Sequence, residues 1–407
     1  MASHELPTGC TLNHPEPLAE LSFFLTRELR RVDSQIARVN VASVQHCEPD
    51  DLPVNPPEAW EAVLRMTAAM AIAARAAGLK SKEVARQDFG GKDTEHLDQA
   101  KRSVDGAAVT AGEQVLGRSR AHIVVKAGEG IRDDSPGAQL DQVLGQDGSE
   151  LHAVIDYVDG TGLAARGLPG ALSLGALGSN IRRTPDLKAF AILAPRAVLA
   201  ELGDWQSPTE LALETLRAVA AARGVGVRDL RVLTHSRDVG APQLSWYQFL
   251  EENAGEVVIP DPISVEPPYI LTRATDSQSL QPKIDCLIGV MGLVELIYAA
   301  LLLDLSAPDD AIHFRLVSGS SAKDLMAAPV KAFNLTERDL MWAETAGLDH
   351  WGRHSSDSFI PPGSALCATM FAVTANRALD LSPASENRVE GLLLLCGGQQ
   401  LRVNIEY

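Results

Sequence analysis

Apolar residues recur at helical spacing in the first third of the chain. The run AWEAVLRMTAAMAIAARAAG predicts a long helix from Ala59, and Gly78 is a typical place for it to stop. A second helix is predicted over 104–116. The polar residues 80–96 between the two are expected to form a loop insertion or a frayed helix, and residues 20–42 also have helical spacing.

After residue 121 the pattern changes to short β-branched runs separated by glycine-rich turns. Strands are predicted at 122–126, 151–156, 171–178, 189–193, 230–234 and 257–260. Helices are predicted over 208–223 and 244–255. The alternation predicts an α/β fold. We expect an N-terminal extension (1–55), a first lobe (56–205) and a second lobe (206–407).

One apolar run, Ile284 to Leu305, is about long enough to span a bilayer. It contains Asp285, Glu295 and Asp304, and each would cost roughly 2.5–3.5 kcal/mol at the centre of a membrane helix. We therefore predict a buried strand, a glycine-bearing turn and a buried helix there, and no membrane span.

Charge and cysteine usage narrow the class of protein. The 407 residues include 36 Lys and Arg against 53 Asp and Glu, a formal charge of −17. This average charge disfavours partners such as nucleic acid or an anionic membrane. An anionic substrate would need a local cation. The five cysteines form no CxxC pair, so reduced thiols are expected. No signal peptide is recognisable in the sequence, and a cytoplasmic location is expected.

Carboxylates gather around the predicted strand ends. Asp156 and Asp159 bracket one strand end and precede a Gly-Thr turn, Glu129 stands between two glycines after the preceding strand, and Asp105 is placed at the start of a helix. Carboxylates that meet at one sheet edge suit hard divalent cations such as Mg²⁺, and a turn with free N–H groups beside them can bind phosphate. Each motif alone is more often a structural turn or cap.

The order of these motifs resembles the class II fructose-1,6-bisphosphatase and sedoheptulose-bisphosphatase family, within the lithium-sensitive, metal-dependent phosphatase superfamily. The resemblance is carried by KRSVDGAAV from Lys101, VVKAGEGIRDD from Val124 and IDYVDGTGLAARGLPGA from Ile155. A weaker match continues in IDCLIGVMGLVE from Ile284.

The resemblance implies a site and a reaction. Asp105, Thr161 and Lys101 would be catalytic, and Gly160, Thr161, His235 and Arg237 would bind the substrate. The metal ligands would be Asp105, Glu129, Asp156, the carbonyl of Val158, Asp159 and Glu295. Water activated by Mg²⁺ or Mn²⁺ would attack a small phosphorylated metabolite in line. The implied fold is a layered αβαβα sandwich. Its first lobe would be the metal-binding phosphatase lobe, its second lobe would complete the substrate site, and the metal would lie between them. The protein would form a homo-oligomer.

Several positions depart from the family. Tyr157 stands where the family usually has Pro, and Asp159 stands where it has Glu. Of the run that grips sugar phosphate only Arg237 is kept, and His235 is as easily a surface residue as a phosphate contact. The sugar pocket is therefore rewritten, and fructose 1,6-bisphosphate is not the expected substrate. A catalytically weakened homologue that binds a sugar phosphate or a partner, or a metal-assisted non-hydrolytic reaction, stays open.

Overall fold

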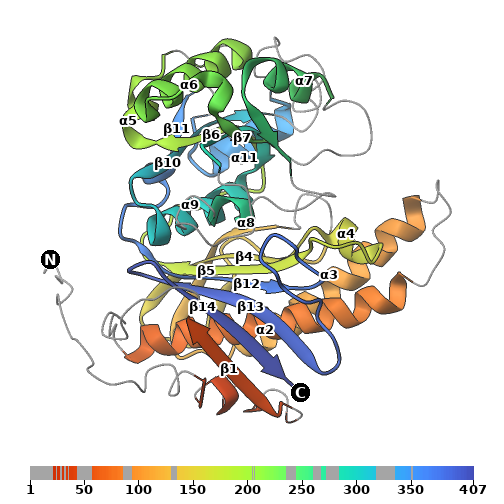
Figure 1. Ribbon diagram of the computed structural model, residues 1–407. Helices are drawn as coiled ribbons and strands as arrows, with labels where there is room; N and C mark the ends of the chain where they lie inside the picture. The colour runs from red at the N-terminus through yellow and green to blue at the C-terminus, as the bar shows by residue number, and fades with distance from the viewer. Residues whose placement is uncertain are drawn as a thin grey trace, which may run out of the picture.

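The computed structural model describes parts of 22–43 and the ranges 57–85, 94–129, 135–203, 207–234, 244–259, 267–271, 284–317, 335–349 and 352–407, together with Trp205. Within them the elements stack as five layers, helix, sheet, helix, sheet, helix (Figure 1). The predicted αβαβα sandwich is confirmed. The order of layers follows from burial, because each sheet is apolar on both faces and must be covered on both.

The first sheet contains eight strands among the described residues, and all its pairings are antiparallel except that of β2 with β4. In spatial order the strands are β1 (Arg38–Ser43), β14 (Gln399–Glu406), β13 (Arg388–Leu395), β12 (Ala365–Ala372), β5 (Leu172–Gly178), β4 (Glu150–Asp159), β2 (His122–Gly128) and β3 (Val143–Gly145).

The second sheet contains six strands among the described residues. In spatial order they are β11 (His354–Ser355), β10 (Asp310–Val317), β6 (Lys188–Pro195), β9 (Cys286–Gly292), β7 (Arg231–Leu233) and β8 (Glu256–Val258). Each sheet contains strands from both sides of the predicted boundary at residues 205 and 206. For example, β6 precedes the boundary and lies in the second sheet, and β12 follows it and lies in the first sheet. The division into lobes at that boundary stays a proposal.

Helices form the three remaining layers. The outer layer on the first sheet consists of α2 (Pro57–Val84) and α3 (Thr94–Leu116), and the short helix α4 (Thr161–Ala165) contacts α3. Between the sheets lie α8 (Pro267–Ile270) and α9 (Leu293–Ser306), with α11 (Glu337–Thr345) packed on the same core. The second sheet is covered by α5 (Arg196–Glu201), α6 (Pro208–Arg223) and α7 (Leu244–Asn253).

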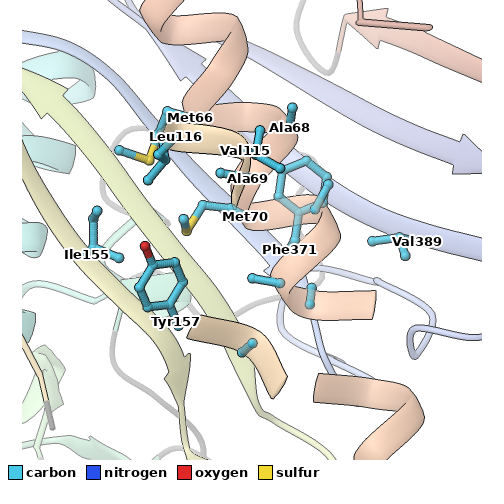
Figure 2. Packing of buried hydrophobic residues seen from close by; sticks show 14 of the residues in the cluster. Met66, Ala68, Ala69, Met70, Val115, Leu116, Ile155, Tyr157, Phe371 and Val389 are labelled. Carbon is cyan, nitrogen blue, oxygen red and sulfur yellow. The ribbon is translucent and has the colours of Figure 1, made fainter. Parts of the chain in front are cut away.

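Most of the first core lies between α2, α3 and the first sheet. Figure 2 shows Ile155 and Tyr157 of β4 on the side of the sheet that faces Met66 and Met70 of α2. The alternation along β4 turns Val154 to the other face, into the core around α9. Asp156 has the same parity as Val154, so its carboxyl is directed toward the layer between the sheets.

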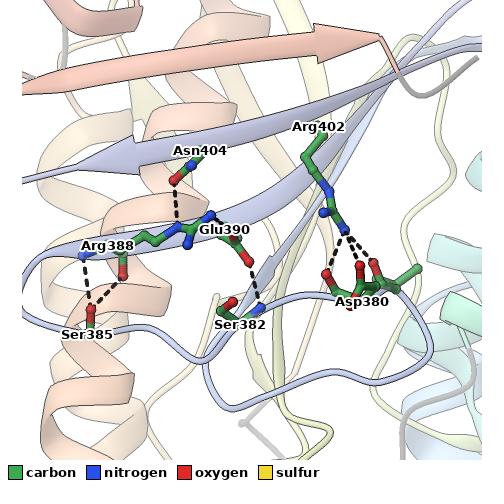
Figure 3. Close-up of polar contacts among 8 residues, drawn as sticks. Asp380, Ser382, Ser385, Arg388, Glu390, Arg402 and Asn404 are labelled. Carbon is green, nitrogen blue, oxygen red and sulfur yellow. Dashed lines mark hydrogen bonds and ion pairs between the residues drawn. The ribbon is translucent and has the colours of Figure 1, made fainter.

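A polar network joins β13 and β14, the C-terminal hairpin of this sheet, to residues 379–382 (Figure 3). Arg402 donates to the carbonyl oxygens of Leu379 and Asp380, at 2.9 and 2.6 Å. Glu390, which is 4% exposed, forms an ion pair with Arg388 and accepts the N–H of Ser382 at 2.7 Å. The buried carboxylate is therefore both paired and hydrogen-bonded, which is the condition for burying it without a large penalty.

The strand, turn and buried helix predicted for Ile284 to Leu305 are confirmed as β9 and α9, with Gly292 between them. Among the described residues a single helix, Ala59–Val84, is apolar and long enough to cross a membrane, and 78% of its apolar window is buried inside the fold. Its apolar surface is thus accounted for by packing against the sheet.

Three sequence predictions are wrong. Helix α2 does not stop at Gly78. A Cβ there would lie 2.7 Å from Cβ of Ala384, so this glycine permits close packing within the helix. Helix α3 begins at Thr94 and not near residue 104, and Asp105 lies in its middle. Residues 38–42 belong to strand β1, because the alternating RVNVAS pairs with β14 along the edge of the sheet.

Candidate active site

A cavity of about 520 Å³ opens where α3, α4 and the ends of β2 and β4 meet. The end of β2 and the end of β4 lie at the same edge because these two strands are parallel. The predicted site residues that line the cavity are Lys101, Asp105, Glu129, Asp156, Val158, Gly160 and Thr161. The fold therefore brings together predicted site residues from three separate segments of the sequence.

Thr161 connects the helix α3 to the end of β4. Its Oγ1 lies 2.7 Å from Oδ1 of Asp105 and 2.8 Å from the carbonyl oxygen of Val158. The other carboxylate oxygen of Asp105 accepts a hydrogen bond from Ser135 at 2.5 Å. Burial raises the pKa of Asp105 to about 6, although the bonds from Ser135 and Thr161 and the charge of Lys101 oppose this shift.

The hydroxyl of Thr161 has one hydrogen and two acceptors within reach. When Asp105 is ionised, the hydroxyl can donate to Oδ1 and leave the carbonyl of Val158 open. When Asp105 is protonated, the acid can donate to Oγ1 while the hydroxyl donates to the carbonyl. This arrangement can move a proton over one hydrogen bond near neutral pH, because the pKa of Asp105 is about 6.

Glu129 and Asp156 form the most strongly perturbed pair of carboxyls in the cavity. Burial, and then the charges of Asp156 and Glu295, raise the pKa of Glu129 well above its usual range. Burial likewise raises the pKa of Asp156, and a hydrogen bond with Glu129 opposes that rise. Oδ1 of Asp156 accepts the N–H of Val158 at 3.0 Å, whereas no donor among the described residues reaches Oδ2. The pair can share a hydrogen bond only while it keeps a proton.

Two further predicted ligands, Asp159 and Glu295, are not among the residues that line the cavity. Asp159 is 8% exposed, and its charge contributes to the raised pKa of Asp156. Glu295 lies in the first turn of α9 and acts on both Glu129 and Asp156 through its charge. This fits the direction of Asp156 toward the layer between the sheets. The five predicted carboxylates are thus electrostatic neighbours.

These residues fit a metal ion by the chemistry of their donor atoms but not by how closely their side chains converge. Within the part of the chain that the structure describes, no group of three or more His, Cys, Asp or Glu side chains converges closely enough to hold one ion. The chemistry of the donors, carboxylate oxygens and the carbonyl of Val158, does suit a hard divalent cation. Mg²⁺ needs only one or two carboxylates because it keeps several waters, so pairs of these residues are sufficient.

Two glycines shape the backbone here. Gly160 precedes α4 with φ +82°, a left-handed conformation that favours glycine. A Cβ at Gly128 would lie 2.1 Å from the carbonyl oxygen of Ala138, so this glycine lets the following loop approach β2. The first glycine of the GEG motif therefore has a packing role.

The cavity also contains residues that the sequence analysis missed. Asp98 and Arg102 line it from α3, and Ser135 lines it from the other side. Asp186, after β5, acts on Glu129 through its charge. An earlier start of α3 would have revealed Asp98 and Arg102, because both share a helical face with Asp105. Neither Ser135 nor Asp186 carries a recognisable pattern.

Lys101 reaches the cavity with a side chain that is 37% exposed and pairs with Asp98 at 3.2 Å. The predicted substrate residues His235 and Arg237 lie outside the described residues. Their proposed roles therefore stay predictions.

Comparison with known proteins agrees with the motifs. Residues 96–241 match the family model of bacterial fructose-1,6-bisphosphatase, glpX-encoded. A stretch of 137 residues is 30% identical to fructose-1,6-bisphosphatase 2 class 2 of Escherichia coli (strain K12). The match covers 33% of this chain and 41% of that protein, less than half of either. Over residues 96–241 the resemblance to the class II fructose-1,6-bisphosphatase family is confirmed.

Proposed function

We propose that this chain is a divalent-cation-dependent phosphatase that hydrolyses a phosphomonoester of a sugar phosphate or a related phosphorylated metabolite. The observation that carries the proposal is the contact of Thr161 with Asp105, at 2.7 Å, in a cavity that also holds the carboxyl pair Glu129 and Asp156. A hydroxyl held against a carboxyl of pKa about 6 is suited to orient a water and accept its proton.

Four residues of the cavity have defined roles in this proposal. Thr161 orients the attacking water, and Asp105 accepts a proton through the Thr161 hydroxyl. The turn at Gly160 presents backbone N–H groups to the phosphoryl oxygens, and Lys101 supplies positive charge beside them. The overall charge of −17 makes such a local cation necessary for an anionic substrate.

The metal belongs to the same proposal. The residues that would hold it are Asp105, Glu129, Asp156, the carbonyl of Val158, Asp159 and Glu295. A bound Mg²⁺ or Mn²⁺ would neutralise the phosphoryl charge and lower the pKa of water. Oδ2 of Asp156, which no donor among the described residues reaches, and the mutual repulsion within the carboxylate pair support a cation there.

The test is phosphate release from a panel of sugar phosphates and phosphorylated cyclitols, with Mg²⁺, with Mn²⁺, without metal, and with added Li⁺. Metal-dependent release that Li⁺ inhibits is the expected result. Asp156→Asn should abolish it while thermal unfolding stays close to that of the parent chain. The matched control is Asp309→Asn, the same change at an exposed residue outside the cavity.

Other outcomes separate the alternatives. Metal binding by calorimetry without phosphate release would favour a non-hydrolytic reaction at a phosphorylated sugar. Absence of both would favour a catalytically weakened homologue. A homo-oligomer and a cytoplasmic location are part of the same proposal, and light scattering and fractionation of cells are the measurements that check them.

A further inference from the structure

The segment that follows β2 brings a hydroxyl to the carboxyl of Asp105. Oγ of Ser135 lies 2.5 Å from Oδ2 of this carboxyl, and Ser135 lines the cavity. The hydroxyl of Thr161, at the start of α4, holds the other oxygen, Oδ1, at 2.7 Å. Two hydroxyls from separate segments of the chain, both outside α3, therefore hold the two oxygens of one carboxyl.

The orientation of this carboxyl depends on those two contacts. Asp105 lies in the middle of α3, and the torsion that turns a carboxyl about its own axis is broad and roughly two-fold. Lys101, one turn earlier on the helix, pairs with Asp98 at 3.2 Å. Among the described residues, the donors that reach the carboxyl of Asp105 are the hydroxyls of Ser135 and Thr161.

The backbone after Ser135 is packed so that its hydroxyl is presented at this point. The residue before a proline is restricted to extended conformations, so Pro136 limits the conformations of Ser135. A Cβ built at Gly106 of α3 would lie 3.7 Å from Cγ of Pro136. A Cβ at Gly128 of β2 would overlap the carbonyl oxygen of Ala138. The segment is therefore fixed against both α3 and β2 close to Ser135.

We propose that Ser135 is a positioning residue that holds the carboxyl of Asp105 in the orientation that presents Oδ1 to Thr161. This rests on the proposed function, in which Asp105 accepts a proton through the Thr161 hydroxyl. Thr161 does not fix the carboxyl by itself, because its hydroxyl has a second acceptor, the carbonyl oxygen of Val158, at 2.8 Å. The bond from Ser135 keeps Oδ2 in place whichever acceptor the Thr161 hydroxyl uses.

Phosphate release by the full chain with Mg²⁺ tests this role, with fructose 6-phosphate, fructose 1,6-bisphosphate and inositol 1-phosphate as probes. Ser135→Ala should lower kcat about tenfold and change KM by less than about twofold, because a misoriented general base slows the reaction without weakening substrate binding. Ser135→Thr keeps the hydroxyl and should recover most of kcat. The control is Ser358→Ala, which removes a serine hydroxyl that donates to the carbonyl of Ser355 at 2.7 Å outside the cavity.

A double variant asks whether Ser135 acts through Thr161. Adding Ser135→Ala to Thr161→Val should cause no further loss of kcat, because the orientation of Asp105 matters only while the Thr161 hydroxyl is present. A further loss, a kcat of Ser135→Ala equal to that of the parent chain, a rise in KM without a fall in kcat, or a Ser135→Thr variant as impaired as Ser135→Ala would each overturn the positioning role.

Crystal structures of the parent chain and of Ser135→Ala, grown without added metal, separate this inference from the proposed activity. The distance from Oγ1 of Thr161 to Oδ1 of Asp105 should stay within hydrogen-bond range in the parent chain and exceed about 3.5 Å in the variant. If the parent chain releases no phosphate but the carboxyl turns in the variant, the hold of Ser135 on Asp105 stands and the phosphatase proposal fails. An unmoved carboxyl in Ser135→Ala would overturn the inference whether or not the chain is active.

Discussion

The ring of Tyr157 fills the space that a side chain at Gly112 would need. A Cβ at Gly112 would lie 2.3 Å from Cε1 of the tyrosine, well inside van der Waals contact. Tyr157 is 3% exposed and stands between Asp156 and Val158 at the end of β4. Gly112 belongs to α3, which carries Asp105. This contact therefore fixes how closely the two elements that supply the candidate site can approach.

Gly112→Ala should destabilise the protein by on the order of 1 kcal/mol. Overpacking a core costs about 1–3 kcal/mol, and the better helix propensity of Ala returns up to about 1 kcal/mol. Urea unfolding measures the difference. The control is Gly106→Ala in the same helix, where a Cβ would meet its nearest neighbour, Pro136, at 3.7 Å and should be neutral or stabilising. Equal effects of the two substitutions would contradict the packing argument.

Tyr157→Phe should leave stability unchanged or raise it by up to about 1 kcal/mol. The phenol oxygen is buried and has no hydrogen-bond partner among the described residues, so its removal eliminates a desolvation cost. The ring and its contact with Gly112 remain. A loss of more than about 1 kcal/mol in urea unfolding would mean that the hydroxyl has a partner in the folded protein.

Thr161→Val should lower kcat/KM by about 10²–10³-fold, because valine keeps the shape but cannot donate to Asp105 or orient a water. Thr161→Ser keeps the hydroxyl and should retain most of the activity. The contrast between these two variants in phosphate release isolates the hydroxyl from its packing. Full activity of Thr161→Val together with a loss in Thr161→Ser would indicate that the methyl group of Thr161, and not its hydroxyl, is what the site requires.

The elements of the layered fold were predictable from the sequence wherever a single hydrophobic periodicity, helical or alternating, dominated the segment. The run from Ile284 was correctly divided into a strand, a glycine-bearing turn and a helix, and the structure places the division at Gly292. Gly78 was misread, since a glycine that allows close packing has the same local signature as one that ends a helix. Strand β1 was missed because its partner, β14, lies at the other end of the chain.

The site was predictable to the extent that its motifs are local. Asp156, Gly160 and Thr161 form one short segment, and the structure places it beside Asp105. Ser135 depends on a fold-level contact that no spacing encodes, although it lies 2.5 Å from Asp105. The role of Tyr157 could not be inferred either, because only packing pairs it with Gly112.

Acid should weaken the fold through His313 of β10. Its Nδ1 is buried without a hydrogen-bond partner among the described residues. Burial, and then the neighbouring charge of Arg353, lower the pKa of His313 from 6.5 to about 4; Asp357 opposes and Arg196 adds to this shift. The unfolded chain therefore binds the proton first as the pH falls, and stability that is complete above pH 6.5 is lost progressively down to about pH 4.

Substituting the histidine isolates this contribution from the many carboxylates that titrate in the same range. One pKa unit corresponds to about 1.4 kcal/mol, and solvent screening at a partly exposed ring reduces the total to on the order of 1–2 kcal/mol. His313→Gln should therefore flatten the fall in unfolding free energy between pH 6.5 and 4. Parallel curves for the parent and His313→Gln would show that His313 titrates alike in the folded and unfolded chains, because only a difference in proton binding between the two states can make stability depend on pH.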